Sequence, residues 1–141
     1  MSLSFDERKA VVDFRIEKAH RAFEQAQGVA ELQYWETIAN RLYYAAYNAV
    51  SALLIAHGYT TRSHDGVIHL FGQHFVKTGI VDVADGKLYH HLFTLRLTGD
   101  YDDTYGLTSE DVLPLITPAS ELIDKVITLA TTKMNELQEH E

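Results

Sequence analysis

The sequence contains no cysteine among its 141 residues. This absence excludes a disulfide framework, a thiolate metal site and a cysteine nucleophile. A cysteine-free chain is compatible with the reducing cytoplasm, which is where we expect this protein to reside.

Long apolar runs are also missing. The longest mostly apolar stretch, Ala45 to His57, is too short to span a bilayer and includes the polar residues Asn48 and Ser51. No basic segment followed by an apolar stretch opens the chain, so we expect no signal peptide. Both absences predict a small intracellular domain that does not associate with membranes.

Positive charge is scarce as well, since 12 Lys and Arg stand against 20 Asp and Glu, a net charge of −8. Residues 1–98 sum to zero, whereas residues 99–141 contain only Lys125 and Lys133 against ten acidic residues. Bulk binding to duplex DNA or to anionic lipid needs a positive face, which this balance does not offer. A local nucleotide or RNA site built from two or three cations stays compatible with it. We interpret the acidic C-terminal third as a solvated helix face.

What the sequence does contain is typical of one globular unit. Its length and its 46% apolar content fit a single helical domain covering residues 1–141. Apolar residues recur at spacings of three and four, and we find no convincing strand pairs. The helices are predicted at residues 4–28, 30–57, 65–78 and 83–96, with a last one that starts at Ser109 or at Thr117–Pro118.

We therefore predict an all-α fold, an up-and-down antiparallel bundle of four to five helices. Ser4 and Glu7 have the form of a capping box at the first helix. The alanine-rich second helix is expected at the centre, and Pro114 and Pro118 predict a kink or a broken start in the last helix. A helical stripe left on the surface would also support a homodimer.

Eight histidines invite a search for a metal site. His64, His69 and His74 recur every five residues and therefore cannot share a helix face. No HExxH pattern is present, and the resemblance of residues 100–111 to a calcium loop fails because position 6 is Tyr105 instead of glycine. There is also no glycine-rich phosphate loop. We predict no metal and no cofactor.

Two polar features remain as candidates for a site. Tyr43 and Tyr47 lie one turn apart, and they either fill the core with a hydroxyl reaching a partner, which we favour, or stack a base. Arg96 lies near the end of an apolar helix, with Asp100 four residues later and Tyr101 beside it. Arg96 and Asp100 form either an ion pair that closes the helix or a polar site whose guanidinium matches a phosphate.

Four short segments in a fixed order resemble the HEPN superfamily (higher eukaryotes and prokaryotes nucleotide-binding domain). They are Arg41-Leu-Tyr-Tyr-Ala-Ala-Tyr47, Arg62-Ser-His64, Phe75-Val-Lys-Thr-Gly79 and Arg96-Leu-Thr-Gly-Asp-Tyr101. The sequence is most similar to the stand-alone branch whose signature ends in Arg-x-x-x-Asp-Tyr. The resemblance implies a helical bundle that usually dimerises. Many members of this superfamily are toxins or defence proteins that cleave RNA without metal, often encoded beside a minimal nucleotidyltransferase antitoxin.

In the superfamily, the RNA-cleaving motif is an arginine followed after four to six residues by a histidine, in a cleft between two subunits. The arginine falls on Arg96, but the histidine would fall on Tyr101, Asp102 or Asp103, so the motif histidine is absent. An imidazole would have to come from His64, or from His90 and His91.

Three hypotheses follow from the residues and the resemblance. The first is a homodimeric domain that binds a nucleotide or RNA and acts with a nucleotidyltransferase in a toxin–antitoxin module. In it Arg96 holds the phosphate, Asp100 orients it, and Tyr101 and Tyr44 pack a base or ribose. The second is a metal-independent endoribonuclease that uses Arg96 and His64 as catalytic residues. The third is a non-catalytic dimeric interaction domain in which Arg96 and Asp100 merely secure a helix end.

Overall fold

The computed structural model describes residues 3–101 and 106–140, and these residues form helices and no strands. The prediction of an all-α fold is confirmed. The helices are α1 (Phe5–Gly28), α2 (Trp35–Ala56), α3 (His64–Phe71), α4 (Val83–Tyr101) and α5 (Ser109–Glu139), with a 3₁₀ turn at Ala30–Leu32 and a π-helical turn at Gly72–Val76.

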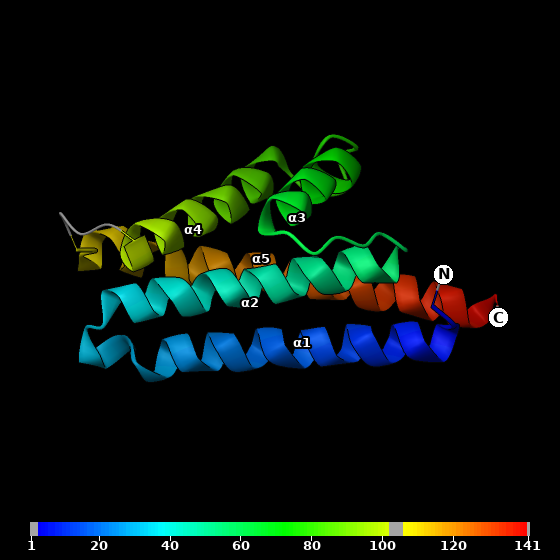
Figure 1. The fold of residues 1–141 in the computed structure, drawn as a ribbon, viewed down its shortest axis with the longest axis horizontal. Coiled ribbons are helices and arrows are strands. Elements are labelled where there is room, and N and C mark those ends of the chain that lie inside the picture. Colours follow the sequence, from blue (N-terminus) through cyan, green and yellow to red (C-terminus); the bar gives the residue numbers. More distant parts are fainter. Residues whose placement is uncertain (1–2, 102–105, 141) are drawn as a thin grey trace.

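The long helices α1, α2, α4 and α5 alternate in direction along the chain, as expected for an up-and-down bundle (Figure 1). Helix α2 lies at the centre and contacts α1, α4 and α5. The short helix α3 and the start of α4 rise together away from α1, and the two ends of the chain lie at the same end of the bundle (Figure 1). None of the helices in the described part of the chain is long and apolar enough to cross a membrane.

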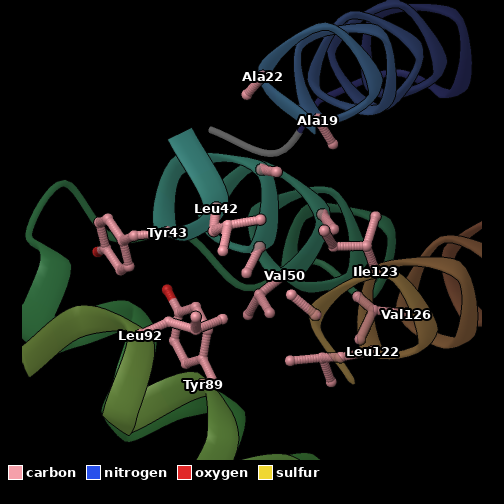
Figure 2. Packing of buried hydrophobic residues seen from close by; sticks show 14 of the residues in the cluster. Ala19, Ala22, Leu42, Tyr43, Val50, Tyr89, Leu92, Leu122, Ile123 and Val126 are labelled. Atoms are coloured by element: carbon pink, nitrogen blue, oxygen red, sulfur yellow. The ribbon is translucent and has the colours of Figure 1, made fainter. Parts of the chain in front are cut away.

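Helix α2 is central because its side chains are apolar around most of its circumference. Figure 2 shows Leu42 and Val50 of α2 packed among side chains from α1, α4 and α5. The residues that α1 buries are all small, which lets its backbone approach α2 closely: Val12, Ala19, Ala22 and Ala26. Burial of each large aliphatic side chain of α2, such as Leu42 and Leu53, contributes roughly 1.5–3 kcal/mol, so the core around α2 is a main source of stability.

The ends of three helices differ from their predictions. The helix predicted at residues 65–78 begins at His64 and ends at Phe71, and a π-helical turn follows it at Gly72–Val76. The helix predicted from residue 30 begins at Trp35, because Gln33 adopts a left-handed φ of 62° that separates it from the 3₁₀ turn. The helix predicted to end at Arg96 continues to Tyr101, so Arg96 and Asp100 lie on the same helix one turn apart. The predicted capping box of Ser4 and Glu7 is present.

Helix α5 begins at Ser109, the earlier of the two predicted starts. Thr108 and Asp111 form a capping box there, and Val112 in the first turns is fully buried. These contacts anchor the first turns, so the helix passes without interruption through Pro114 and Pro118, and the broken start was a wrong expectation.

Candidate functional site

Arg96 is a charged residue in the core, with only 8% of its surface exposed. Helix α4 directs it toward α2, where its guanidinium carbon lies 5.2 Å from the ring centre of Tyr43 and 5.6 Å from that of Tyr44. The ring of Phe93 is 5.9 Å away. A cation over aromatic faces gains about 2 kcal/mol or more where water is excluded, so these rings hold the guanidinium in place.

The polar partners of Arg96 are few. Its Nη1 lies 3.5 Å from Oδ2 of Asp100, which also accepts a hydrogen bond of 3.4 Å from Nδ2 of Asn40. Its buried Nε has no hydrogen-bond partner within the described residues. A buried donor left unsatisfied costs about 1–3 kcal/mol. Burial of the guanidinium therefore costs free energy. An ion pair with Asp100 that only secures the end of the helix does not explain this cost.

His64 reaches the same cluster from α3. Its ring lies near the three rings that Arg96 contacts, with centre-to-centre distances of 5.7 Å to Tyr43, 5.9 Å to Tyr44 and 6.4 Å to Phe93. Its closest aromatic neighbour is Tyr47 at 4.6 Å. The fold thus places an imidazole near Arg96 although no histidine follows Arg96 at the motif spacing. We call these six residues, Arg96, His64, Tyr43, Tyr44, Tyr47 and Phe93, the Arg96–His64 cluster.

The first turn of α3 fixes the position of His64. Ser63 caps this helix, its Oγ accepting a hydrogen bond of 2.9 Å from the backbone nitrogen of Gly66. A Cβ atom at Gly66 would lie 2.1 Å from Oγ1 of Thr61 and 2.8 Å from Oγ of Ser63. Only glycine allows the preceding loop to fold this closely against the helix start that carries His64.

The cluster keeps His64 neutral. Burial, followed by the positive charge of Arg96, lowers the pKa of His64 from its ordinary value of 6.5, while Asp65 opposes this shift. Burial also raises the pKa of Tyr43, so its phenol keeps its proton.

A hydrogen bond of 2.5 Å joins the Tyr43 hydroxyl to Nδ1 of His64. If the hydroxyl donates, Nε2 of the neutral ring carries the proton and can donate to an anion. If Nδ1 donates to the hydroxyl oxygen, Nε2 keeps a free lone pair and can act as a base. The favoured prediction that Tyr43 is a core residue whose hydroxyl reaches a partner is therefore confirmed.

The remaining predicted residues lie at different distances from this cluster. Asp100 is one turn beyond Arg96, whereas Tyr101 at the last residue of α4 is 71% exposed. His90 and His91 line a separate, mostly apolar groove of about 530 Å³ between α3 and α4, and His90 only approaches the cluster through Phe93, at 6.4 Å. Asp102 and Asp103, where the motif histidine would fall, lie outside the described residues.

Sequence reasoning did not identify the residues that support Asp100. Oδ1 of Asn40 accepts hydrogen bonds of 3.0 and 2.6 Å from Nε and Nη2 of Arg41, while its Nδ2 donates to Asp100. Adjacent polar residues in an apolar helix are the only signal that could have indicated them. Across the described ranges, no three His, Asp or Glu side chains gather in a way that could hold a metal ion.

Comparisons with known proteins agree with this fold. The model of the HEPN domain matches residues 12–130. A UPF0332 protein of Thermotoga maritima is 32% identical over 121 residues, covering 86% of this chain and 92% of the relative. A protein of Methanocaldococcus jannaschii named "Putative toxin MJ0605" is 29% identical over 111 residues, covering 79% of this chain and 82% of its own.

Among solved structures, the crystal structure of TT1696 from Thermus thermophilus is similar to this chain with a TM-score of 0.65. The similarity covers 86% of this chain and 97% of that one, at 17% identity. At this identity the likeness concerns the fold alone.

Proposed function

Because the chain belongs to the HEPN domain family, we propose that it is a nucleotide- and RNA-binding domain whose phosphate site is the Arg96–His64 cluster. The observation that carries the proposal is a buried guanidinium, held by three aromatic rings that also neighbour the imidazole of His64. A rigid guanidinium matches the geometry of a phosphate, and its fixed position lowers the entropic cost of binding.

The other residues of the site have supporting roles. Asp100 orients the guanidinium through Nη1 and is itself held by Asn40. Tyr44 is half-buried and presents its ring between Arg96 and Arg41, where a base or ribose can pack. Tyr101 is exposed one turn away and offers a second ring. His64, with its Nε2 proton, donates to a second phosphate oxygen.

We extend the proposal to a toxin-associated module. The relative from Methanocaldococcus jannaschii carries the word toxin in its name, and the resemblance described above implies a homodimer acting with a minimal nucleotidyltransferase antitoxin. Induced expression in a bacterial host is expected to slow growth, and co-expression with a nucleotidyltransferase encoded beside this chain is expected to restore it. Normal growth in both cases would contradict the toxin role, and the proposal of a phosphate site would not be affected.

A binding titration tests the phosphate site itself. Adenosine 5′-monophosphate and a labelled 12-nucleotide single-stranded RNA are titrated into the wild type and into Arg96→Met, which keeps the bulk and loses the charge. The matched control is Lys87→Met, which removes one positive charge from the exposed face of the same helix. We expect binding to be lost only in Arg96→Met. Equal affinity in all three proteins would contradict the proposal and favour a non-catalytic interaction domain.

A second candidate function, a metal-independent endoribonuclease, is favoured by the position of His64. In that reaction Nε2 of His64 takes the proton of a ribose 2′-hydroxyl, whose oxygen attacks the adjacent phosphorus. The 5′-oxygen leaves with a proton from water, and a 2′,3′-cyclic phosphate forms, while Arg96 stabilises the charge on the non-bridging oxygens. This role requires the tautomer in which Nδ1 donates to Tyr43.

Incubation of mixed RNA with the protein in EDTA separates the two functions. Cleavage by the wild type that disappears in both His64→Ala and Arg96→Ala would support the nuclease. RNA binding without cleavage, measured beside an active ribonuclease control, would restrict the site to binding.

A further inference from the structure

A row of cations lies on α1, on the far side of Tyr44 and Tyr47 from Arg96. Arg15, Lys18 and Arg21 are spaced three residues apart, so they follow one side of the helix. Helix α2, which packs alongside α1 (Figure 1), adds Arg41. Four positive charges therefore gather on one face of a chain whose net charge is −8.

Three of these cations, Lys18, Arg21 and Arg41, line a groove of about 390 Å³ between α1 and α2, a volume within the range of small-ligand sites. Arg15 lies next to this groove, since it donates a hydrogen bond to Asn48, which lines it. None of the described residues that line it is acidic; they are Lys18, Arg21, Ala22, Gln25, Arg41, Tyr44 and Asn48. We call this the α1–α2 groove.

Two of the arginines are held in place without a carboxylate. Nη1 of Arg15 donates a hydrogen bond of 2.9 Å to Oδ1 of Asn48, and Nη1 of Arg41 donates one of 3.1 Å to Oε1 of Gln25. Within residues 3–101 and 106–140, neither arginine forms an ion pair. Guanidinium groups that are oriented by amides keep their full charge for an anion.

The α1–α2 groove adjoins the Arg96–His64 cluster at Tyr44, which lines the groove and contacts Arg96. The ring centre of Tyr44 lies 5.3 Å from the guanidinium carbon of Arg41 and 5.6 Å from that of Arg96. The ring of Tyr47 lies 6.0 Å from Arg15 and 4.6 Å from His64. Tyr44 thus has a cation of the groove and a member of the cluster as neighbours, and Tyr47 has the adjacent Arg15 and His64.

We propose that the α1–α2 groove binds the sugar–phosphate backbone of single-stranded RNA, next to the nucleotide whose phosphate Arg96 holds. Cations that follow a backbone, with aromatic rings between them, are the arrangement that binds single strands. Duplex nucleic acid demands a wide positive surface, whereas here the cations are confined to one groove and the C-terminal third is acidic. The inference rests on the proposed function for the adjacent nucleotide, but the groove is testable separately.

The test compares two double variants of the full chain with the wild type. Lys18→Ala/Arg21→Ala removes two charges of the groove. The control, Lys9→Ala/Lys77→Ala, removes two exposed charges elsewhere: nine residues separate Lys9 from Lys18, about two and a half turns, so Lys9 lies on the opposite face of α1. The probes are the labelled 12-nucleotide RNA, titrated at several salt concentrations, and adenosine 5′-monophosphate, whose single phosphate is the one that Arg96 holds in the proposed function.

We expect the groove variant to bind the 12-nucleotide RNA about tenfold more weakly at moderate salt, because two phosphate contacts are lost. The slope of log affinity against log salt concentration is expected to fall by about 1.4, which is about 0.7 for each contact on a single strand. The affinity for adenosine 5′-monophosphate is expected to stay within twofold, and the control variant is expected to match the wild type.

The contrary outcomes are distinct. If the monophosphate binds in an Arg96-dependent way but the groove variant binds RNA as tightly as the wild type, the groove inference is wrong and the proposed function stands. If RNA binding depends on Lys18 and Arg21 but not on Arg96, the groove is supported and the proposed phosphate site is wrong. If the control variant loses as much affinity as the groove variant, the charges act without a defined groove and the inference fails.

Discussion

The two sides of α2 differ in chemistry. The side toward α1 and α5 packs mainly small and aliphatic residues, apart from the hydrogen bonds of Arg15 to Asn48 and of Arg41 to Gln25, and Figure 2 shows Ala19, Ala22 and Val126 there. The side toward α3 and α4 carries Tyr43 bonded to His64 and packed on Arg96. One helix thus provides both the scaffold and the site, and the rigidity of the first side positions the second.

The largest change in the free energy of unfolding is expected on the side of α2 toward α1 and α5. Leu53 of α2 is fully buried, so Leu53→Ala leaves a cavity and should lower the free energy of unfolding by about 2–5 kcal/mol. The control Leu113→Ala changes a leucine of α5 that is 47% exposed and should stay within about 0.5 kcal/mol. Urea denaturation measures both. Equal losses would mean that α2 is not the centre of the core.

A smaller loss of stability is expected where the loop before α3 meets its first turn. Gly66→Ala places a Cβ atom against Thr61 and Ser63 and should cost about 1–3 kcal/mol. It should also shift the NMR resonances of His64, because that residue starts the same turn. Gly72→Ala, where a Cβ atom would meet nothing within 4 Å and the backbone is helical, is the control: it should leave the resonances of His64 unchanged and raise stability by about 0.4–1 kcal/mol. A Gly66→Ala protein with wild-type stability and spectra would show that the loop can move aside.

The side of α2 toward α3 and α4 is expected to respond differently when the charge of Arg96 is removed. Arg96→Met removes an incompletely satisfied buried guanidinium and keeps most of its packing, so the free energy of unfolding should change by less than about 1 kcal/mol. Thermal melting of this variant beside the wild type measures the difference. A loss as large as that of Leu53→Ala would assign Arg96 a structural role and remove the contrast between the two sides.

The smallest expected effect is on the pH dependence of the protein's stability. Burial lowers the pKa of His64 and of His57, so the folded state favours their neutral forms and the unfolded state binds more protons. Their contribution to stability is therefore complete above pH 6.5 and is lost as the pH falls through the lowered pKa values of the folded state. Denaturation midpoints between pH 7.5 and about 5 should fall less steeply in His64→Gln/His57→Gln than in the exposed control His20→Gln. Parallel curves would contradict the burial of these two rings.

The difference between the sides also explains how much the sequence predicts. Apolar spacing and the capping residues Ser4 and Glu7 predict the helices and the central place of α2, because these signals are local. Arg96, Asp100 and Tyr44 are recognisable from spacing and resemblance. The position of His64 near Arg96 depends on tertiary structure, because the loop that folds against Gly66 determines it. The spacing of residues in the sequence does not predict it. The charges of the α1–α2 groove escape a count of net charge because residues 1–98 contain equal numbers of acidic and basic residues.

The most direct test of the central claim follows the imidazole of His64 by NMR, with and without adenosine 5′-monophosphate. In the free protein we expect a pKa below the ordinary 6.5. A phosphate held by Arg96 beside the ring should raise this pKa, since a neighbouring negative charge favours the protonated imidazole. The same addition to Arg96→Met should leave it unchanged. An identical pKa of His64 with and without saturating monophosphate in the wild type would contradict the claim that this cluster is the phosphate site.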